Sequence, residues 1–130
     1  MLAATVAMSV FPGAAMARGY SFGAMVRSYS GSYPVTVTDT QRGNFTGCLT
    51  LTGNGSASLV IGSQKFTFGT YLVIDDTFVA TIEAQGYGQN AGLVFIAPAS
   101  RRLGQGVYEE VYGGEDFESG ALAFGMKGGC

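Results

Sequence analysis

The residues of this chain best suited to chemistry are five acids within ten positions, with no lysine or arginine among them: Glu109, Glu110, Glu115, Asp116 and Glu118. Carboxylate oxygens are the ligands that Ca²⁺ prefers, and a pair of carboxylates can share acid and base roles in hydrolysis. These acids could form a hairpin that is simply solvated, or a cation site at Glu115, Asp116 and Glu118. The spacing of the three residues does not match an EF-hand. Because Glu109 and Glu110 are adjacent on an expected strand, they face opposite sides and cannot act as a catalytic pair. We expect a solvated hairpin with no metal.

A glycine-rich loop, Gly86-Tyr87-Gly88-Gln89-Asn90, has the composition of a binding site for uncharged polar ligands. It offers an aromatic ring, two side-chain amides, and glycines that permit close approach of a ligand such as a sugar. The alternative is an ordinary turn whose tyrosine packs on the edge of the fold. We predict ligand contacts from Tyr87, Gln89 and Asn90, and from Tyr112, which borders the loop 113–118.

Several classes of catalytic and cofactor site are excluded or disfavoured by the residue types. The chain has no histidine, which excludes Ser-His-Asp and Cys-His nucleophilic systems and histidine-ligated zinc. It also lacks a phosphate-binding G-x-x-x-x-G-K-[ST] motif. The net charge of −2 argues against nucleic acid as a partner. We expect no cofactor, and we favour a protein that is not an enzyme.

The two cysteines and the first residues together indicate export. Residues 2–11 are apolar, Pro12-Gly13 ends that run, and Ala15-Met16-Ala17 resembles a signal-peptidase site. We therefore expect a signal peptide over 1–17, a secreted or periplasmic product, and no stable membrane insertion after cleavage. In an oxidising compartment Cys48 and Cys130 should form an intramolecular disulfide; pairing between two chains through Cys130 is the alternative.

The rest of the chain reads as short strands separated by turns. Hydrophobic residues make up 47% and charged residues 12% of the sequence, which argues against disorder. After an N-terminal arm at 18–32, we predict a single all-β domain over 33–130. It is a small antiparallel barrel or sandwich of about eight strands, most of them connected by hairpins. The predicted strands are 33–40, 47–53, 56–62, 65–74, 77–84, 92–97, 105–112 and 119–125.

Alternation of residue types predicts which side chains face the core. Val35 and Val37 share one face, and Phe66 and Phe68 continue such a pattern until Gly69, where the phase changes and a bend or bulge is expected. The run 93–96, Leu-Val-Phe-Ile, is apolar on both faces. That strand is therefore either covered by the arm or available as a contact surface.

Three functions remain, from different classes. The first is a non-catalytic binding module that takes a small molecule or glycan at the end of the fold with the long loops. The second is a structural or protein-interaction role that uses the apolar strand 93–96 as an interface, in a monomer or weak homodimer. The third and least favoured is an enzyme that works with carboxylates and tyrosine. An enclosed cavity would favour the first, and a concentration-dependent dimer the second.

Overall fold

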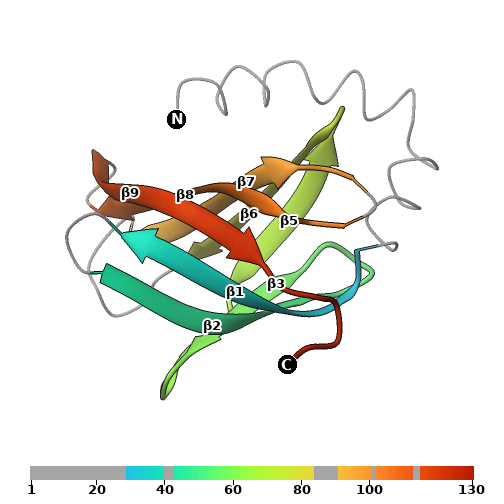
Figure 1. The fold of residues 1–130 in the computed structure, drawn as a ribbon, viewed down its shortest axis with the longest axis horizontal. Coiled ribbons are helices and arrows are strands. Elements are labelled where there is room, and N and C mark those ends of the chain that lie inside the picture. The colour runs from blue at the N-terminus through green and yellow to red at the C-terminus, as the bar shows by residue number, and fades with distance from the viewer. Residues whose placement is uncertain (1–28, 40–42, 84–90, 101, 113–114) are drawn as a thin grey trace.

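The structure is a computed structural model, described for residues 29–39, 43–83, 91–100, 102–112 and 115–130. These residues form one antiparallel sheet of nine strands in the order β4-β3-β2-β1-β9-β8-β7-β6-β5 (Figure 1). Each strand pairs with at least one strand that is adjacent to it in the chain. In addition, β1 pairs with β9. The predicted all-β fold is confirmed. The strands are β1 (Gly31–Asp39), β2 (Gly43–Leu51), β3 (Ala57–Ile61), β4 (Gln64–Phe66), β5 (Gly69–Ile74), β6 (Thr77–Glu83), β7 (Gly92–Pro98), β8 (Gln105–Tyr112) and β9 (Glu115–Phe124).

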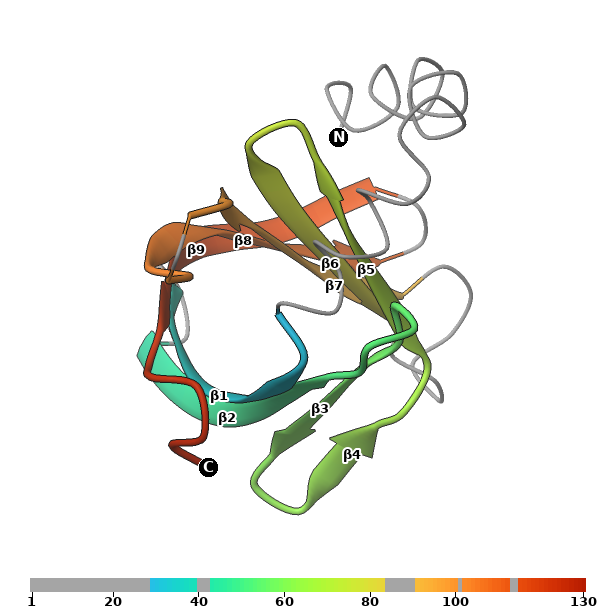
Figure 2. The same cartoon turned by 90° about the vertical axis from the view of Figure 1, so that its right-hand side faces the viewer.

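The sheet curls into a nearly closed barrel, and its two edges meet between β3 and β5 (Figure 2). The predicted strand 65–74 is divided here: β4 pairs with β3, and β5 pairs with β6. The two edges are joined by a bridge between Ser56 and Thr70, and by the Tyr71 N–H, which donates to the Gly55 carbonyl at 2.9 Å. One segment of chain therefore closes the barrel by changing its pairing partner.

Gly69 makes this change of partner sterically possible. A Cβ at this position would lie 2.7 Å from the Ala57 carbonyl oxygen and 2.9 Å from the Thr81 carbonyl oxygen. Because both neighbours are backbone atoms of paired strands, neither can move aside cheaply. At the bend predicted at Gly69, the backbones of β3, β5 and β6 thus lie close together.

The interior of the barrel is filled by side chains that alternate along each strand. Leu93 and Phe95 point inward, whereas Val94 and Ile96 lie on the outer face of β7. Large side chains from most of the strands are almost fully buried: Tyr108, Phe78, Phe95, Leu49, Leu51, Leu59, Ile82, Leu122 and Val37. A barrel of about eight strands has an interior wide enough for side chains of this kind.

Aromatic rings close one end of the interior around Phe78. Its ring centroid lies 6.0 Å from that of Tyr29, 5.8 Å from that of Tyr71 and 5.7 Å from that of Phe124. The Tyr29 hydroxyl donates to the Ser100 carbonyl at 2.7 Å, which ties the end of the predicted arm to the barrel. Burial raises the pKa of Tyr71 to about 12, with a smaller contribution from Tyr33, so the hydroxyl stays protonated at neutral pH.

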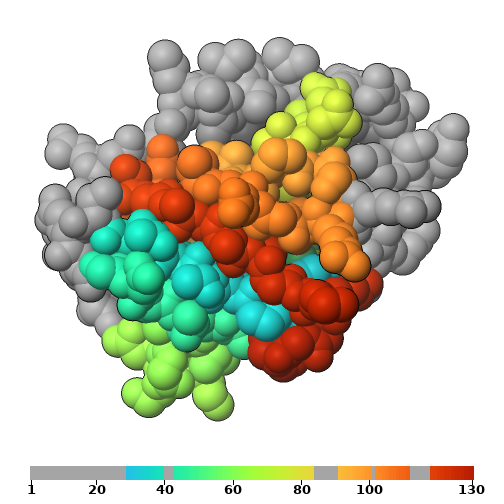
Figure 3. Space-filling view, in the orientation of Figure 1, coloured from blue at the N-terminus to red at the C-terminus, as the bar shows by residue number. Residues whose placement is uncertain are grey.

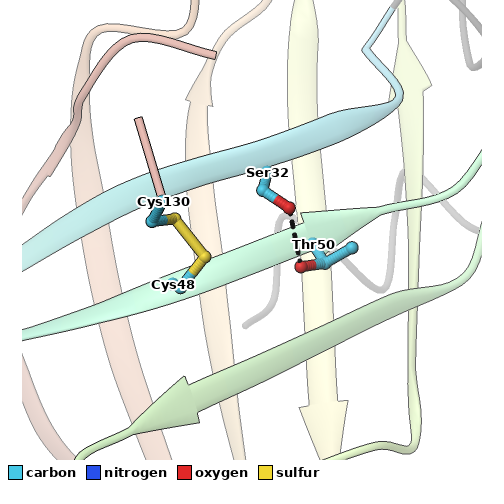
Figure 4. The surroundings of a disulfide bond; sticks show 4 residues. All are labelled: Ser32, Cys48, Thr50 and Cys130. Carbon is cyan, nitrogen blue, oxygen red and sulfur yellow. Dashed lines mark hydrogen bonds between the residues drawn. A yellow bond between two sulfur atoms is a disulfide. The ribbon is translucent and has the colours of Figure 1, made fainter. Parts of the chain in front are cut away.

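The predicted disulfide between Cys48 and Cys130 is present, on the outside of the barrel (Figure 4). After β9 the chain continues along β1, with the Gly125 N–H donating to the Pro34 carbonyl and the Gly128 N–H to the Ser32 carbonyl. Cys48 is paired with Pro34 in the sheet, so the tail crosses one strand to reach it. The tail needs no long path along the barrel, because the stagger between strands brings the middle of β2 level with the end of β9.

Replacing Gly69 with alanine should destabilise the protein. The added Cβ would overlap two backbone carbonyls, and overpacking of this kind costs about 1–3 kcal/mol. Urea unfolding of Gly69→Ala should therefore show a lower midpoint than the parent chain. Gly104→Ala is the matched control, because a Cβ there would have nothing within 4 Å. Equal midpoints for the two variants would contradict this account of the closure.

Loss of the disulfide should lower stability without changing the fold. The two cysteines are 82 positions apart, for which the chain-entropy model gives about 4.5 kcal/mol as an upper limit. Cys48→Ala should reduce the Tm by several degrees while the circular dichroism spectrum is preserved. Cys130→Ala and the double variant should match it, since each removes the same single bond. A further drop in the double variant would mean that the cysteines act separately.

Candidate functional site

Three carboxylates meet at the end of the barrel where β1 and β8 finish and β9 starts. Asp39 is the last residue of β1, and Glu110 on β8 lies directly opposite Glu118 on β9. Asp39 is paired with Gly120, which in turn is paired with Tyr108. The side chains of the three carboxylates and of Tyr108 lie on the inner face, because they continue the alternation set by the core residues of their strands.

The carboxylate group is compact and partly buried. Asp39, Glu110 and Glu118 each place an oxygen within 4.8 Å of the others, and Asp39 is only 3% exposed. The Tyr108 hydroxyl donates to Glu110 Oε2 at 3.1 Å. Gly120 permits the close approach of β1 and β9 at this point, since a Cβ on it would lie 2.0 Å from the Thr38 carbonyl oxygen. The arrangement offers several hydrogen-bond acceptors with one tyrosine donor bound among them.

The sequence located only part of this group. It placed Glu109 and Glu110 on opposite faces, which agrees with the inward position of Glu110. It expected the acidic hairpin to be solvated, but Glu110 and Glu118 are half-buried. Of the alternative cation ligands, Glu118 joins the group, while the side chains of Glu115 and Asp116 lie outside those described. Asp39 was missed, although its position two residues after the inward Val37 was a usable signal.

A second candidate site is a groove of about 440 Å³ on the outer surface, at the seam where β5 begins. It lies where the chain leaves β4 for β5, beside the last residues of β6. The Glu83 N–H donates to the Phe68 carbonyl at 2.8 Å and so joins the two sides of the groove. The lining residues are Ser56, Thr67, Phe68, Gly69, Thr70, Thr81 and Glu83.

The groove combines an aromatic ring with hydroxyl groups and one carboxylate. Phe68 is 55% exposed, so its ring is accessible at the surface. The hydroxyls come from a serine and three threonines, and Glu83 supplies the carboxylate. The ring offers an apolar face, while the surrounding groups donate and accept hydrogen bonds. Such a set suits a ligand that is itself part apolar and part polar.

The position of Phe68 differs from the sequence expectation. Alternation placed it on the same face as Phe66, which does pack against the core. The bend at Gly69 breaks the alternation, because the chain has already left β3 and is turning toward β6. Phe68 therefore points away from the core, and its ring becomes available at the groove.

The predicted ligand contacts lie beside this groove in the chain but are not described. Glu83, which lines the groove, is followed directly by the segment 84–90, which carries Tyr87, Gln89 and Asn90 and lies outside the described residues. Tyr112 pairs with Glu115 in the sheet, and its side chain is not described. These contacts stay predictions.

Calcium should change the stability of the protein little. Ca²⁺ takes 6–8 oxygen ligands, whereas this group provides three carboxylates, one of which already accepts from Tyr108. A thermal-shift titration with CaCl₂ to millimolar concentration should leave the Tm within about a degree of its starting value. A saturable increase that disappears in Glu118→Gln would show that the carboxylates hold the ion.

Comparisons with known proteins assign neither a family nor a function to this chain. Family models, curated proteins and solved structures contain no match to the chain. Within the described residues, no helix has the length and apolar character needed to cross a membrane.

Proposed function

We propose that this protein is an exported, non-catalytic binding module that takes a glycan in the groove beside Phe68. The observation that carries the proposal is the exposed aromatic ring surrounded by hydroxyl groups in a groove of about 440 Å³. A sugar ring presents an apolar C–H face and several hydroxyls, and both features have counterparts here. The volume falls within the range of small-ligand sites.

A site on the outside of the barrel agrees with the large side chains that point inward. Phe78, Phe95 and Tyr108 are buried in the interior, where a small barrel holds either side chains or one small ligand. The groove lies on the outer surface at the seam, and Glu83, which lines it, directly precedes the segment 84–90 in the chain.

Charge and chemistry favour a neutral ligand and binding without catalysis. Glu83 is the one acid among the described residues that line the groove, and glycoside hydrolysis by the usual route needs two carboxylates on either side of the scissile bond. A single carboxylate instead serves well as an acceptor for sugar hydroxyls. The described lining includes no lysine or arginine to attract phosphate or sulfate groups.

Two features support export. The apolar leader ending at Ala17 fits a signal peptide, and the Cys48–Cys130 disulfide is compatible with an oxidising compartment. A secreted or periplasmic location would bring the groove into contact with glycans of a cell surface or the surrounding medium.

Binding should depend on the ring of Phe68. The mature chain would be tested against a panel of neutral mono- and oligosaccharides by NMR chemical-shift titration and calorimetry. Phe68→Ala should weaken binding about five- to thirtyfold, because loss of one well-placed stacking contact costs roughly 1–2 kcal/mol. Thr81→Val, which removes one hydroxyl at nearly constant volume, should weaken it less. Met126→Ala is the control, since Met126 is 69% exposed and does not line the groove.

Other outcomes would redirect or reject the proposal. Binding that survives Phe68→Ala but is lost in Tyr87→Ala would move the site to the loop 84–90. Turnover of any sugar in the panel would show that the protein is an enzyme. A folded parent chain that binds no member of the panel at millimolar concentration would count against glycan binding altogether.

A further inference from the structure

The turn that joins β2 to β3 contains the one Asn-Gly pair in the sequence. Asparagine occurs at three positions, as Asn44-Phe45, Asn54-Gly55 and Asn90-Ala91. A side-chain carboxamide can be attacked by the backbone nitrogen of the residue that follows it. A glycine in the following position hinders this approach least, because it has no Cβ. By residue type alone, Asn54 is therefore the asparagine at which such a reaction is easiest.

The turn exposes the Asn54 side chain and directs two donors at its carbonyl oxygen. Asn54 is exposed, and its Oδ1 accepts from the Thr52 hydroxyl and from the Ser56 N–H, the latter at 3.3 Å. Gly55 has a φ of 94°, which glycine adopts without strain. Its N–H donates to the Thr52 carbonyl at 3.2 Å, at the long end of the usual range, so little is lost when this nitrogen turns toward Asn54.

We propose that Asn54 is a site of spontaneous covalent modification, at which the chain converts to an isoaspartyl linkage. The Gly55 nitrogen loses its proton to hydroxide and bonds to Asn54 Cγ, the Cγ–Nδ2 bond breaks, and Nδ2 takes up a proton and leaves as ammonia. The product is a cyclic succinimide. Water then adds to either carbonyl carbon of the ring and breaks the bond from that carbon to the Gly55 nitrogen, which gives aspartate or isoaspartate. The net reaction consumes one water and releases one ammonia.

The donors in the turn act on the atom where charge develops. Negative charge builds up on Asn54 Oδ1 while the Gly55 nitrogen bonds to Cγ. The Thr52 hydroxyl and the Ser56 N–H are already hydrogen-bonded to this oxygen, so they stabilise the charge without a rearrangement of their own. The folded turn therefore assists the step in which the succinimide forms.

An isoaspartyl linkage at this turn changes the seam of the barrel. It routes the backbone through Cβ of residue 54, which adds one carbon atom to the main chain just before Gly55. The Gly55 carbonyl accepts from the Tyr71 N–H at 2.9 Å, and the Thr52 carbonyl accepts from the Tyr71 hydroxyl. These two bonds cross the seam from either side of the added atom. One of them can keep its position only if the other is displaced.

The seam is held by less pairing than the other closure of the barrel. There, β1 pairs with β9 from Val35 to Asp39, and the two strands lie side by side across the surface in Figure 3. At the seam, the described residues form one isolated bridge, between Ser56 and Thr70, beside the bonds from Tyr71. The modification should therefore open the seam locally and leave the rest of the sheet paired.

The experiment follows the folded mature chain over time in a mildly alkaline buffer at physiological temperature, without ligand. Peptide mapping by mass spectrometry should locate the replacement of NH₂ by OH at Asn54 before any at Asn44. An assay with an isoaspartyl methyltransferase should detect isoaspartate in the product. A synthetic peptide of residues 50–58 is the reference for the same sequence without the fold. Asn54→Ser is the control and should give no isoaspartate from this peptide.

The isoaspartyl form, once separated by chromatography, tests the effect on the seam. Its Tm should be several degrees below that of the parent chain. Hydrogen exchange of the Tyr71 amide should be at least about tenfold faster, because its acceptor has moved. The Gly125 N–H, which donates to the Pro34 carbonyl beside the other closure, should exchange as before. Asn54→Asp has the same charge on a normal backbone and should match the parent in all three measurements.

Thr52→Val tests the hydroxyl donor. It removes the hydroxyl at nearly constant volume and should slow the modification of Asn54 several-fold, whereas Thr52→Ser should keep the rate of the parent. Equal or faster modification in Thr52→Val would overturn the role assigned to Thr52.

Three results would overturn the inference itself. They are a folded chain that stays unmodified at Asn54 while the peptide 50–58 converts, modification of Asn44 ahead of Asn54, and an isoaspartyl form whose Tm and Tyr71 exchange match those of the parent. Because no ligand is present, each result is independent of whether the groove binds a glycan.

Discussion

Closure of the sheet is the constraint on which the rest of the structure depends. An antiparallel meander leaves two edge strands with unpaired backbone groups. In this chain, contacts in two places pair most of those groups. At the first, β1 pairs with β9, the strand farthest from it in the chain. At the second, the segment that contains Gly69 leaves β3 for β6. Without both closures, the large inward side chains would lie on one face of an open, solvent-exposed sheet.

The bend at the seam has a direct consequence for the surface of the barrel. Because the chain leaves β3 and turns toward β6 at Gly69, Phe68 points away from the core and its ring is exposed. The groove at Phe68 therefore follows from the way in which the sheet closes. The inward side chains of Phe78, Phe95 and Tyr108 are buried by the same closure.

Much of the fold was predictable from local pattern, and the part that was not depends on pairing between distant segments. Alternation placed Val35 and Val37 on one face, which is the inward one, because the alternation depends only on strand geometry. It failed at Phe68, where a bend changes the phase. It also gave no reason to bring Asp39 next to Glu118, since neighbours in a sheet are set by long-range pairing. The groove required both the bend and the pairing, and so it was not visible in the sequence.

The disulfide strengthens the closure that is entropically the most demanding. Pairing β1 with β9 brings together segments separated by most of the domain, and the entropy lost in closing such a loop grows with its length. The Cys48–Cys130 bond links β2 to the tail that follows β9, across β1. The tail also packs on Pro34, whose ring lies 2.8 Å from where a Cβ on Gly129 would be. The covalent link therefore holds the first, second and last strands together, whereas the other closure relies on hydrogen bonds and on the absence of a side chain at Gly69.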